Sequence, residues 1–311
     1  MNIAHLRYAV EIAKTGSITQ AADNLYMGQP NMSKAVKELE STLGIVIFKR
    51  TPRGVVPTQK GKEFLAYARN ILAQIDNLES HYKQQEEDNQ SFSAFVPRGS
   101  YIATAFTRFV NELDFDRALE LNFKETNTMA IMNGVLEYEC NLGIIRYQAS
   151  YEDYFQNMIK DRGLKSRPVL EYEYKALMSK DHPLAGIEQV NDQQICGYTE
   201  IMHGDLAVPF LPVTNPTESG CEKMTKRRIY VYERGSQFDL LVNVPGTYMW
   251  VSPMPREVLD RYGLVQKSCK VSGHRYRDVL IYHRDYHFTE LDKLFLEKLE
   301  TVKTELGTCP N

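Results

Sequence analysis

Residues 17–58 constrain the fold of this chain most strongly, because they encode two short helices and a basic hairpin in close succession. Ser17 can accept a hydrogen bond from the backbone amide of Gln20 while the Gln20 side chain reaches back, which is the capping-box start of a helix. The next apolar residues fall on one side at helical spacing: Ile18, Ala21, Ala22 and Leu25. Gly28 and Pro30 then mark a turn and the start of a second helix.

The second helix is predicted to have two different faces. Its apolar residues recur at intervals of four, three and four, so this stripe must be buried: Met32, Val36, Leu39 and Leu43. The opposite face is small, polar and basic, which suits entry into the major groove of DNA. The residues predicted to contact DNA from these helices are Thr19, Gln29, Pro30, Asn31, Ser33, Lys34 and Lys37. This pattern is typical of a helix-turn-helix.

A basic hairpin is expected to follow. Gly44 suits a helix end, residues 45–48 are predicted to form a strand, and residues 49–54 form the tip. Residues 41–62 contain five Lys or Arg and no acidic residue. In a winged helix such a tip lies beside the sugar–phosphate backbone, where cations displace counterions. The predicted contacts are Lys49, Arg50 and Arg53. The alternative is a solvated turn that is merely basic.

Over about its first 70 residues the chain resembles the LysR-type transcriptional regulators. The resemblance is carried by Ser17, Thr19, Ala21 and Ala22, by QPxxSxxxxxLExxLGxxxF at residues 29–48, by the basic tip, and by Thr58 and Gly61. Asn31 and Met32 differ from the residues that are commoner in the family, and so do Gly28 and Lys34.

Those two departures have different consequences. Gly28 stands where the family often has serine, but glycine at a helix N-cap costs only a few tenths of a kcal/mol. Lys34 stands where arginine is commoner, which replaces a bidentate donor by a point charge and can change which bases are read.

The resemblance implies an α/β multidomain protein. A winged helix-turn-helix at residues 1–58 is followed by a long linker or dimerisation helix at 59–88 and an effector-binding domain at 91–311. The implied partners are double-stranded DNA with inverted-repeat-like half-sites, a small-molecule effector, RNA polymerase and further copies of the chain, as a homodimer or homotetramer.

The linker helix carries a heptad seam that a single helix cannot bury. The seam consists of Phe64, Ala68, Ile71, Ile75 and Leu78. Packing on its own domain is one alternative. The resemblance implies instead antiparallel pairing with a second subunit, so that two DNA-binding heads reach two half-sites. The polar run at residues 84–90 predicts a domain boundary.

From Phe92 onward strands alternate with helices, which predicts parallel sheets covered by helices. The expected strands are 92–96, 119–123, 142–145, 169–178, 197–202, 229–233, 248–252 and 278–283. The expected helices begin near Ser100 and cover 126–137, 236–243 and 289–304. The order of elements and the DHPL run at 181–184 resemble a two-lobed, periplasmic-binding-protein-like effector domain, with lobe I at about 91–161 and 272–304 and lobe II at about 165–266.

A ligand of such a domain lies where strand ends and helix N-termini converge between the lobes. The predicted effector-binding residues are Arg98, Ser100, Tyr101, Thr128, Arg146 and His203. Guanidinium groups, hydroxyls and helix N-termini favour a small carboxylate or similar anion. The alternatives are an ion pair for Arg146, a simple cap for Ser100 and a satisfied loop position for His203.

The charge distribution separates the DNA-binding head from the rest. The whole chain has a net charge of −3, but residues 1–60 carry eight Lys or Arg against four Asp or Glu. Only this part is charged to bind DNA. The chain has no apolar leader and no run of 18 apolar residues, so a cytoplasmic location without a membrane partner is expected.

No cofactor, metal or catalytic motif is expected. The sequence contains no GxGxxG, Walker loop, GxSxG or HExxH pattern, and its seven histidines do not cluster. The five cysteines are expected to be reduced thiols: Cys140, Cys196, Cys221, Cys269 and Cys309. Some relatives sense peroxide through a cysteine pair in the second lobe, where Cys196 and Cys221 lie with a wider spacing.

Three classes of protein can combine a small N-terminal domain with a two-lobed α/β domain. A ligand-responsive transcription factor agrees with both the basic head and the two-lobed domain. A two-lobed enzyme fused to a DNA-binding head lacks a recognisable catalytic motif. A solute-binding module is disfavoured by the basic head and the missing signal peptide.

Overall fold

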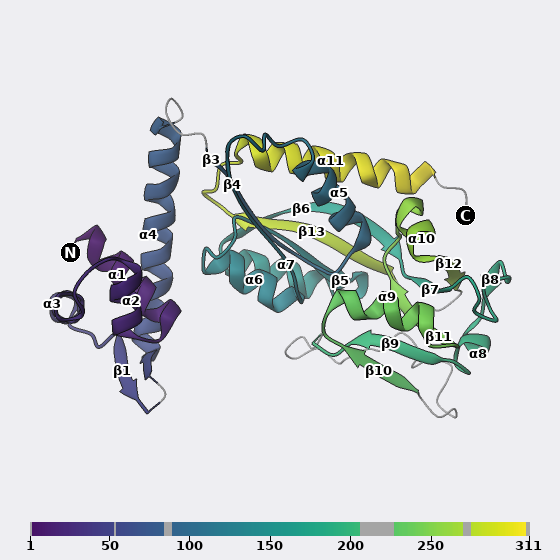
Figure 1. Ribbon diagram of the computed structural model, residues 1–311, viewed down its shortest axis with the longest axis horizontal. Helices are drawn as coiled ribbons and strands as arrows, with labels where there is room; N and C mark the ends of the chain where they lie inside the picture. Colours follow the sequence, from purple (N-terminus) through teal and green to yellow (C-terminus); the bar gives the residue numbers. More distant parts are fainter. Residues whose placement is uncertain (1, 53, 84–88, 206–226, 270–274, 309–311) are drawn as a thin grey trace. The chain divides into compact units, whose positions relative to one another are not determined.

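The computed structural model describes residues 2–52, 54–83, 89–205, 227–269 and 275–308 (Figure 1). The chain forms two compact units, residues 1–88 with 136–138, and residues 89–135 with 139–311.

The first unit is a winged helix-turn-helix followed by a long helix (Figure 1). Its elements are α1 (Ile3–Thr15), α2 (Ile18–Asn24), α3 (Gln29–Leu43), β1 (Phe48–Thr51), β2 (Gly54–Pro57) and α4 (Gln59–Lys83). The buried side chains come from the three short helices, from the residue before β1 and from α4. They are Ile12, Ala21, Ala22, Met32, Val36, Leu39, Ile47 and Leu65. This core fixes which face of α3 points outward.

The start of α2 is only half a capping box. The Ser17 hydroxyl accepts the amide hydrogen of Gln20 at 3.3 Å, as predicted. The Gln20 side chain donates instead to Asn24 at 3.0 Å, so the predicted reciprocal bond is wrong. Leu43, predicted to be buried, is 37% exposed because it lies where α3 ends, and Leu25 at the end of α2 is likewise 36% exposed.

The first strand begins three residues later than predicted. Residues 45–47 are not in a strand; β1 starts at Phe48 and pairs antiparallel with β2. The reason is Glu40 of α3, whose carboxylate accepts the amide hydrogens of Ile47 at 2.6 Å and Phe48 at 3.1 Å. A helix side chain thus takes donors that a strand neighbour would otherwise use.

Thr58 and Gly61 join the hairpin to α4. The Thr58 hydroxyl donates to the Val46 carbonyl at 2.6 Å and accepts the amide hydrogen of Gly61 at 2.9 Å. A Cβ atom at Gly61 would lie 2.0 Å from the Ile47 carbonyl oxygen, so the helix approaches the chain more closely than any side chain permits. The start of α4 is therefore held against Val46 and Ile47, just before β1.

The heptad seam of α4 divides into two parts. Ala68 is fully buried and Phe64 packs against the core beside Leu65, so here the predicted dimerisation surface is covered within the chain. Ile71 is 37% exposed and Ile75 is half-buried. The Leu78 side chain lies outside the described residues.

The second unit contains two mixed sheets. The first has the strand order β4-β3-β5-β13-β6, with α5 and α11 on one face and α6 and α7 on the other (Figure 1). Its elements are β3 (Asn89–Val96), α5 (Ser100–Val110), β4 (Ala118–Glu125), α6 (Thr128–Leu136), β5 (Leu142–Gln148), a 3-10 turn (Ala149–Tyr151), α7 (Glu152–Asp161), β6 (Leu164–Glu173), β13 (Arg275–His283) and α11 (Glu290–Thr308).

The second sheet has the strand order β10-β9-β11-β7-β12-β8. Its elements are β7 (Lys175–Ser179), β8 (Gln189–Val190), α8 (Asp192–Ile195), β9 (Thr199–His203), β10 (Arg228–Val231), α9 (Arg234–Asn243), β11 (Thr247–Val251), α10 (Arg256–Tyr262) and β12 (Leu264–Cys269). Leu177 and Met249 belong to the core with α9 and α10, whereas their neighbours Met178 and Trp250 belong to the core beside α8. The strands are thus buried on both faces.

The prediction of parallel sheets is wrong, because both sheets are mixed. β13 runs antiparallel to both β5 and β6, and β7 runs antiparallel to both β11 and β12. The single strand predicted at 169–178 is two strands in different sheets, because β6 pairs with β13 through residue 173 whereas β7 begins at Lys175 in the other sheet. Lobe I therefore includes β6. The sequence pattern also missed α7, α8, α10, β8 and β12.

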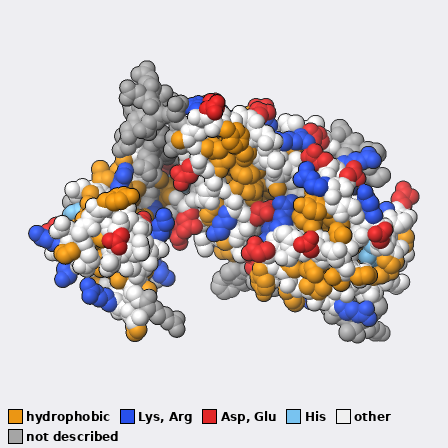
Figure 2. All heavy atoms as spheres, in the orientation of Figure 1, with side chains coloured by type: hydrophobic (Ala, Val, Ile, Leu, Met, Phe, Trp, Pro, Cys, Tyr) orange, Lys and Arg blue, Asp and Glu red, His pale blue; other side chains and the backbone are white. Residues whose placement is uncertain are grey.

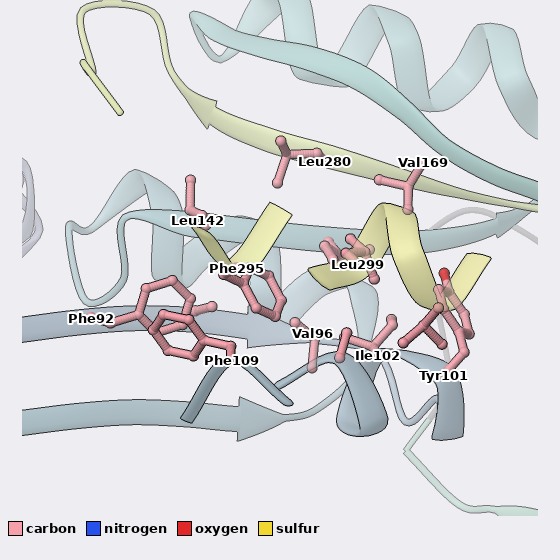
Figure 3. Close-up of a cluster of buried hydrophobic side chains, with 14 of the residues drawn as sticks. Phe92, Val96, Tyr101, Ile102, Phe109, Leu142, Val169, Leu280, Phe295 and Leu299 are labelled. Atoms are coloured by element: carbon pink, nitrogen blue, oxygen red, sulfur yellow. The ribbon is translucent and has the colours of Figure 1, made fainter. Parts of the chain in front are cut away.

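The core of lobe I is aromatic and aliphatic. Figure 3 shows that side chains from β3, α5, β5, β13 and α11 point toward one another. Phe92 and Phe109 lie with ring centroids 4.8 Å apart, and Phe92 and Phe295 5.1 Å apart. These contacts fix the C-terminal end of α5, and Tyr101 and Ile102, which are buried in the same core, hold its N-terminal end in place.

Candidate functional site

The candidate DNA-binding face lies on α3. Gln29, Pro30, Asn31, Lys34 and Lys37 are exposed, and Ser33 is half-buried. Met32 and Leu39, on the opposite face, are 0% and 1% exposed. Thr19 on α2 is exposed as well. The helix thus presents polar and basic side chains outward, while its apolar side chains on the opposite face are buried.

The hairpin presents two cations from the middle of β1. Lys49 pairs in register with Val56 and Arg50 with Val55, and both cations are exposed. Lys and Arg side chains project at several places from the visible face of the first unit (Figure 2). Arg53 lies outside the described residues.

A second candidate site lies at the boundary between the two lobes. Arg98, in the turn between β3 and α5, forms a bidentate pair with Asp205 of lobe II, with both N–O distances at 2.9 Å. It also donates to the Tyr232 carbonyl at 2.7 Å. Burial acts to raise the pKa of Asp205, but the hydrogen bonds and charge of Arg98 outweigh it and lower that pKa. The Arg98 pair holds the lobes together.

A matching pair runs from lobe II to lobe I. Arg234, the first residue of α9, donates to Glu125 at 2.8 Å and to the Ser100 hydroxyl at 2.8 Å. Ser100 was predicted to cap α5, but it is the first residue of that helix and Gly99 is the N-cap. The Ser100 hydroxyl instead accepts from the opposite lobe.

Arg146 is engaged inside lobe I. Its guanidinium donates to the two oxygens of Asp278 at 2.8 and 2.7 Å and to the Arg98 carbonyl at 3.1 Å. Tyr101 and Tyr172 donate their hydroxyl hydrogens to the same carboxylate. Burial raises the pKa of both phenols, so they remain protonated donors.

Thr128 and His203 complete the predicted set. The Thr128 hydroxyl donates to the Arg146 carbonyl at 2.6 Å, which connects α6 to β5. His203, at the end of β9, is only 9% exposed, and its Nδ1 atom has no hydrogen-bond partner among the described residues. Burial, aided by the charge of Arg98, lowers the pKa of His203 to about 4.

The stability of the protein should therefore fall on acidification through His203. Between its ordinary pKa of about 6.5 and the folded value of about 4, the unfolded chain binds a proton that the folded chain does not. The free energy of unfolding should decrease by up to about 3 kcal/mol as the pH falls from 7 to 4. Denaturant unfolding measured across this pH range should show that the free energy of unfolding falls less steeply in His203→Gln than in the wild type. The same change at half-buried His5 of the first unit is the matched control, and an unchanged slope in His203→Gln would contradict the assignment.

Four of the six predicted effector residues, Arg98, Tyr101, Thr128 and Arg146, form one chain of contacts, whereas Ser100 and His203 are not part of it. The Arg98 side chain reaches Asp205, and its carbonyl meets Arg146. Tyr101 joins this chain through Asp278 and Thr128 joins through Arg146, while Ser100 pairs with Arg234. The sequence reading missed the acidic and basic partners: Glu125, Asp205, Arg234 and Asp278. Only the position of Glu125 at a strand end and of Arg234 at a helix start could have indicated them.

The cysteines differ from expectation at one position. Neither Cys140 nor Cys269 forms a disulfide, and burial raises the pKa of the Cys140 thiol to about 12. Cys196 is disulfide-bonded, so the expectation of a reduced thiol is wrong there. Cys221 and Cys309 lie outside the described residues.

The described residues contain neither a metal-ligand cluster nor a membrane-spanning helix. Within the described ranges no three His, Cys, Asp or Glu side chains are grouped so that they could hold a metal ion. Among the same residues no helix combines the length and apolar character needed to traverse a bilayer.

Sequence comparisons point to one group of proteins. Residues 3–62 match the family described as "Bacterial regulatory helix-turn-helix protein, lysR family". The chain is 28% identical to the uncharacterized HTH-type transcriptional regulator YnfL of Escherichia coli over 60% of each chain. It is 42% identical to the nitrogen assimilation regulatory protein nac of Klebsiella aerogenes over 25% of this chain and 26% of the relative. The chain thus spans less than two thirds of the length of these relatives.

Solved structures share the fold. A cysteine variant of full-length OxyR from Pseudomonas aeruginosa superposes with a TM-score of 0.66 at 16% identity, over 96% of this chain and 97% of that one. Full-length CbnR complexed with its target DNA superposes with a TM-score of 0.58 at 14% identity, over 97% and 100%. At such identities the likeness concerns the fold alone.

Proposed function

Because the chain belongs to the LysR family of bacterial helix-turn-helix regulators, we propose that it is a sequence-specific, DNA-binding transcriptional regulator controlled by a small-molecule effector. The observation that carries this proposal is the two-faced α3, whose exposed side is polar and basic while Met32 and Leu39 opposite are buried.

The two parts of the DNA-binding surface have different roles. Gln29 and Ser33 on α3 read base edges in the major groove, because amide and hydroxyl groups match the hydrogen-bonding pattern there. Lys34 and Lys37 flank them on the same helix. Lys49 and Arg50 of the hairpin contact phosphates and supply sequence-independent affinity.

This division of roles predicts two distinguishable mutants. Gln29→Ala should cost about 1–3 kcal/mol of binding free energy on duplexes with the preferred base pairs and little on mixed-sequence DNA. Arg50→Ala should weaken binding to all duplexes and reduce the slope of log affinity against log salt by about one unit. Fluorescence anisotropy over a salt series, with operator and mixed-sequence duplexes, separates the two. An equal loss of Gln29→Ala on both duplexes would show that α3 does not read bases.

A second copy of the chain completes the DNA-binding unit. Ile71 is 37% exposed on α4 and Ile75 is half-buried, and they continue the heptad seam beyond the part covered by α1 and its own core. Pairing of these residues with a second α4 gives two heads that reach two half-sites. A dimer, which can assemble further into a tetramer, follows from this arrangement.

The effector is a small anion that binds at the boundary of the lobes. Arg98 and Arg234 carry guanidinium groups there, and neither α5 nor α9 has a side-chain cap on its N-terminal amides. Both guanidinium groups already face carboxylates of the chain, Asp205 and Glu125. An effector carboxylate therefore exchanges with an internal carboxylate instead of filling an empty cationic site.

Such an exchange couples binding to the angle between the lobes. When an effector carboxylate displaces Asp205 from Arg98, one link between the lobes is broken and a new one forms through the effector. A differential affinity of a few kcal/mol for two lobe arrangements is enough to shift their populations. Across an oligomer this shift changes the spacing of the DNA-binding heads.

The anionic class of the effector can be tested by thermal unfolding of the full chain with a panel of mono- and dicarboxylates and their amides. A carboxylate that raises the unfolding temperature, while its amide does not, supports the proposal. Stabilisation by uncharged compounds alone would contradict it.

A further inference from the structure

Tyr26 occupies an unusual position in the turn between α2 and α3. Its side chain is 98% exposed, more than any other large apolar or aromatic side chain of the described residues. Its backbone φ is +51°, in the left-handed region that favours glycine. Among the described residues other than glycine, only Tyr138 shares a positive φ.

The backbone around Tyr26 ends α2 in a Schellman motif. The amide of Met27 donates to the Ala22 carbonyl at 3.0 Å, and the amide of Tyr26 donates to the Asp23 carbonyl at 3.2 Å. Tyr26 is thus the C′ residue, the position where glycine is most strongly enriched. Met27 packs against the core that contains Ala22, which is the apolar contact that accompanies the motif.

Nothing among the residues that the structure describes accounts for a tyrosine at this position. The backbone conformation disfavours any side chain, and an exposed ring gains no packing in the free protein. A strained residue that persists without an internal reason points to a role outside the chain.

We propose that the Tyr26 hydroxyl donates a hydrogen bond to a phosphate of the DNA backbone at the edge of the major groove. The proposal rests on the DNA-binding function proposed above. Tyr26 lies two residues before Gly28, the N-cap of α3, and that helix start has no side-chain cap. Tyrosine hydroxyls and helix N-termini are both groups that hold phosphates in protein–DNA complexes and fix the register of the reading helix.

Because the backbone of Tyr26 is left-handed, substitutions there should change thermal stability and DNA affinity in different ways. Tyr26→Gly relieves the backbone, so the midpoint of thermal unfolding should rise, whereas affinity for a mixed-sequence duplex at low salt should fall about tenfold. Tyr26→Asn, which also tolerates this conformation, should behave in the same way. Tyr26→Phe keeps the ring and the strain but lacks the donor, and it should bind about fivefold more weakly at an unchanged midpoint.

Phe115→Ala is the matched control, because Phe115 is 66% exposed in the second unit, and it should bind the duplex like the wild type. The proposal is overturned if Tyr26→Phe binds like the wild type, or if Tyr26→Gly lowers the midpoint. If the wild-type chain itself binds no duplex, the proposed function fails first, and the two failures are therefore distinguishable.

Discussion

Replacing Asp278 by asparagine is expected to lower the free energy of unfolding of the second unit by about 3–5 kcal/mol. The Asp278 side chain is 0% exposed, and it is the carboxylate that balances the buried guanidinium of Arg146. Removing one partner of a buried ion pair leaves the other charge without compensation in a medium of low dielectric constant. Tyr101 and Tyr172 also lose a charged acceptor for their hydroxyl groups.

Urea unfolding followed by circular dichroism measures this loss, and two further variants define its cause. Glu171→Gln removes one of the two carboxylates, Glu152 and Glu171, that pair with Arg277 on the exposed side of β13, and it should cost less than about 1 kcal/mol. Arg146→Met combined with Asp278→Leu removes both charges and should recover part of the loss. If Asp278→Asn destabilises no more than Glu171→Gln, the buried pair does not stabilise lobe I as described.

Replacing Gly61 by alanine is expected to disrupt the first unit at the point where the hairpin meets α4. The new methyl group would lie 2.0 Å from the Ile47 carbonyl oxygen and 2.9 Å from its carbonyl carbon, and both are backbone atoms that a rotamer change cannot move. We expect a loss of about 3 kcal/mol or more, since such overpacking forces the backbone to shift. Because Lys49 and Arg50 begin two residues after Ile47, DNA affinity should fall with stability.

Gly235→Ala is the matched control for this effect. Gly235 lies inside α9 with no atom within 4 Å of the added Cβ, and alanine is the better helix former by up to about 1 kcal/mol. The two glycine-to-alanine changes should therefore have opposite signs in thermal unfolding. A Gly61→Ala protein as stable as the wild type would show that α4 does not approach Ile47 so closely.

The helix-turn-helix could be predicted from the sequence because its signals are local. The Ser17 cap, the Gly28 and Pro30 turn and the spacing from Met32 to Leu39 each involve residues within one or two helical turns. The start of β1 could not be predicted, because Glu40 takes the amides of residues seven and eight positions away.

The boundary between the lobes was the least predictable part. Arg98 and Asp205 are 107 residues apart in the sequence, and Arg234 and Glu125 are 109 apart. Sequence spacing carries no signal for such pairs, since they arise only when two sheets meet. The sequence did indicate that Arg98, Ser100 and Arg146 gather near one place, because strand ends and helix starts converge in an α/β domain.

The most direct test of the central claim is a gel-shift titration of the purified full-length chain with genomic fragments at low ionic strength, repeated over a salt series. A regulator that reads DNA through α3 should retard particular fragments, with log affinity falling linearly with log salt and with mixed-sequence DNA bound more weakly. If no fragment is retarded at low salt, the assignment of α3 and the hairpin to DNA is contradicted.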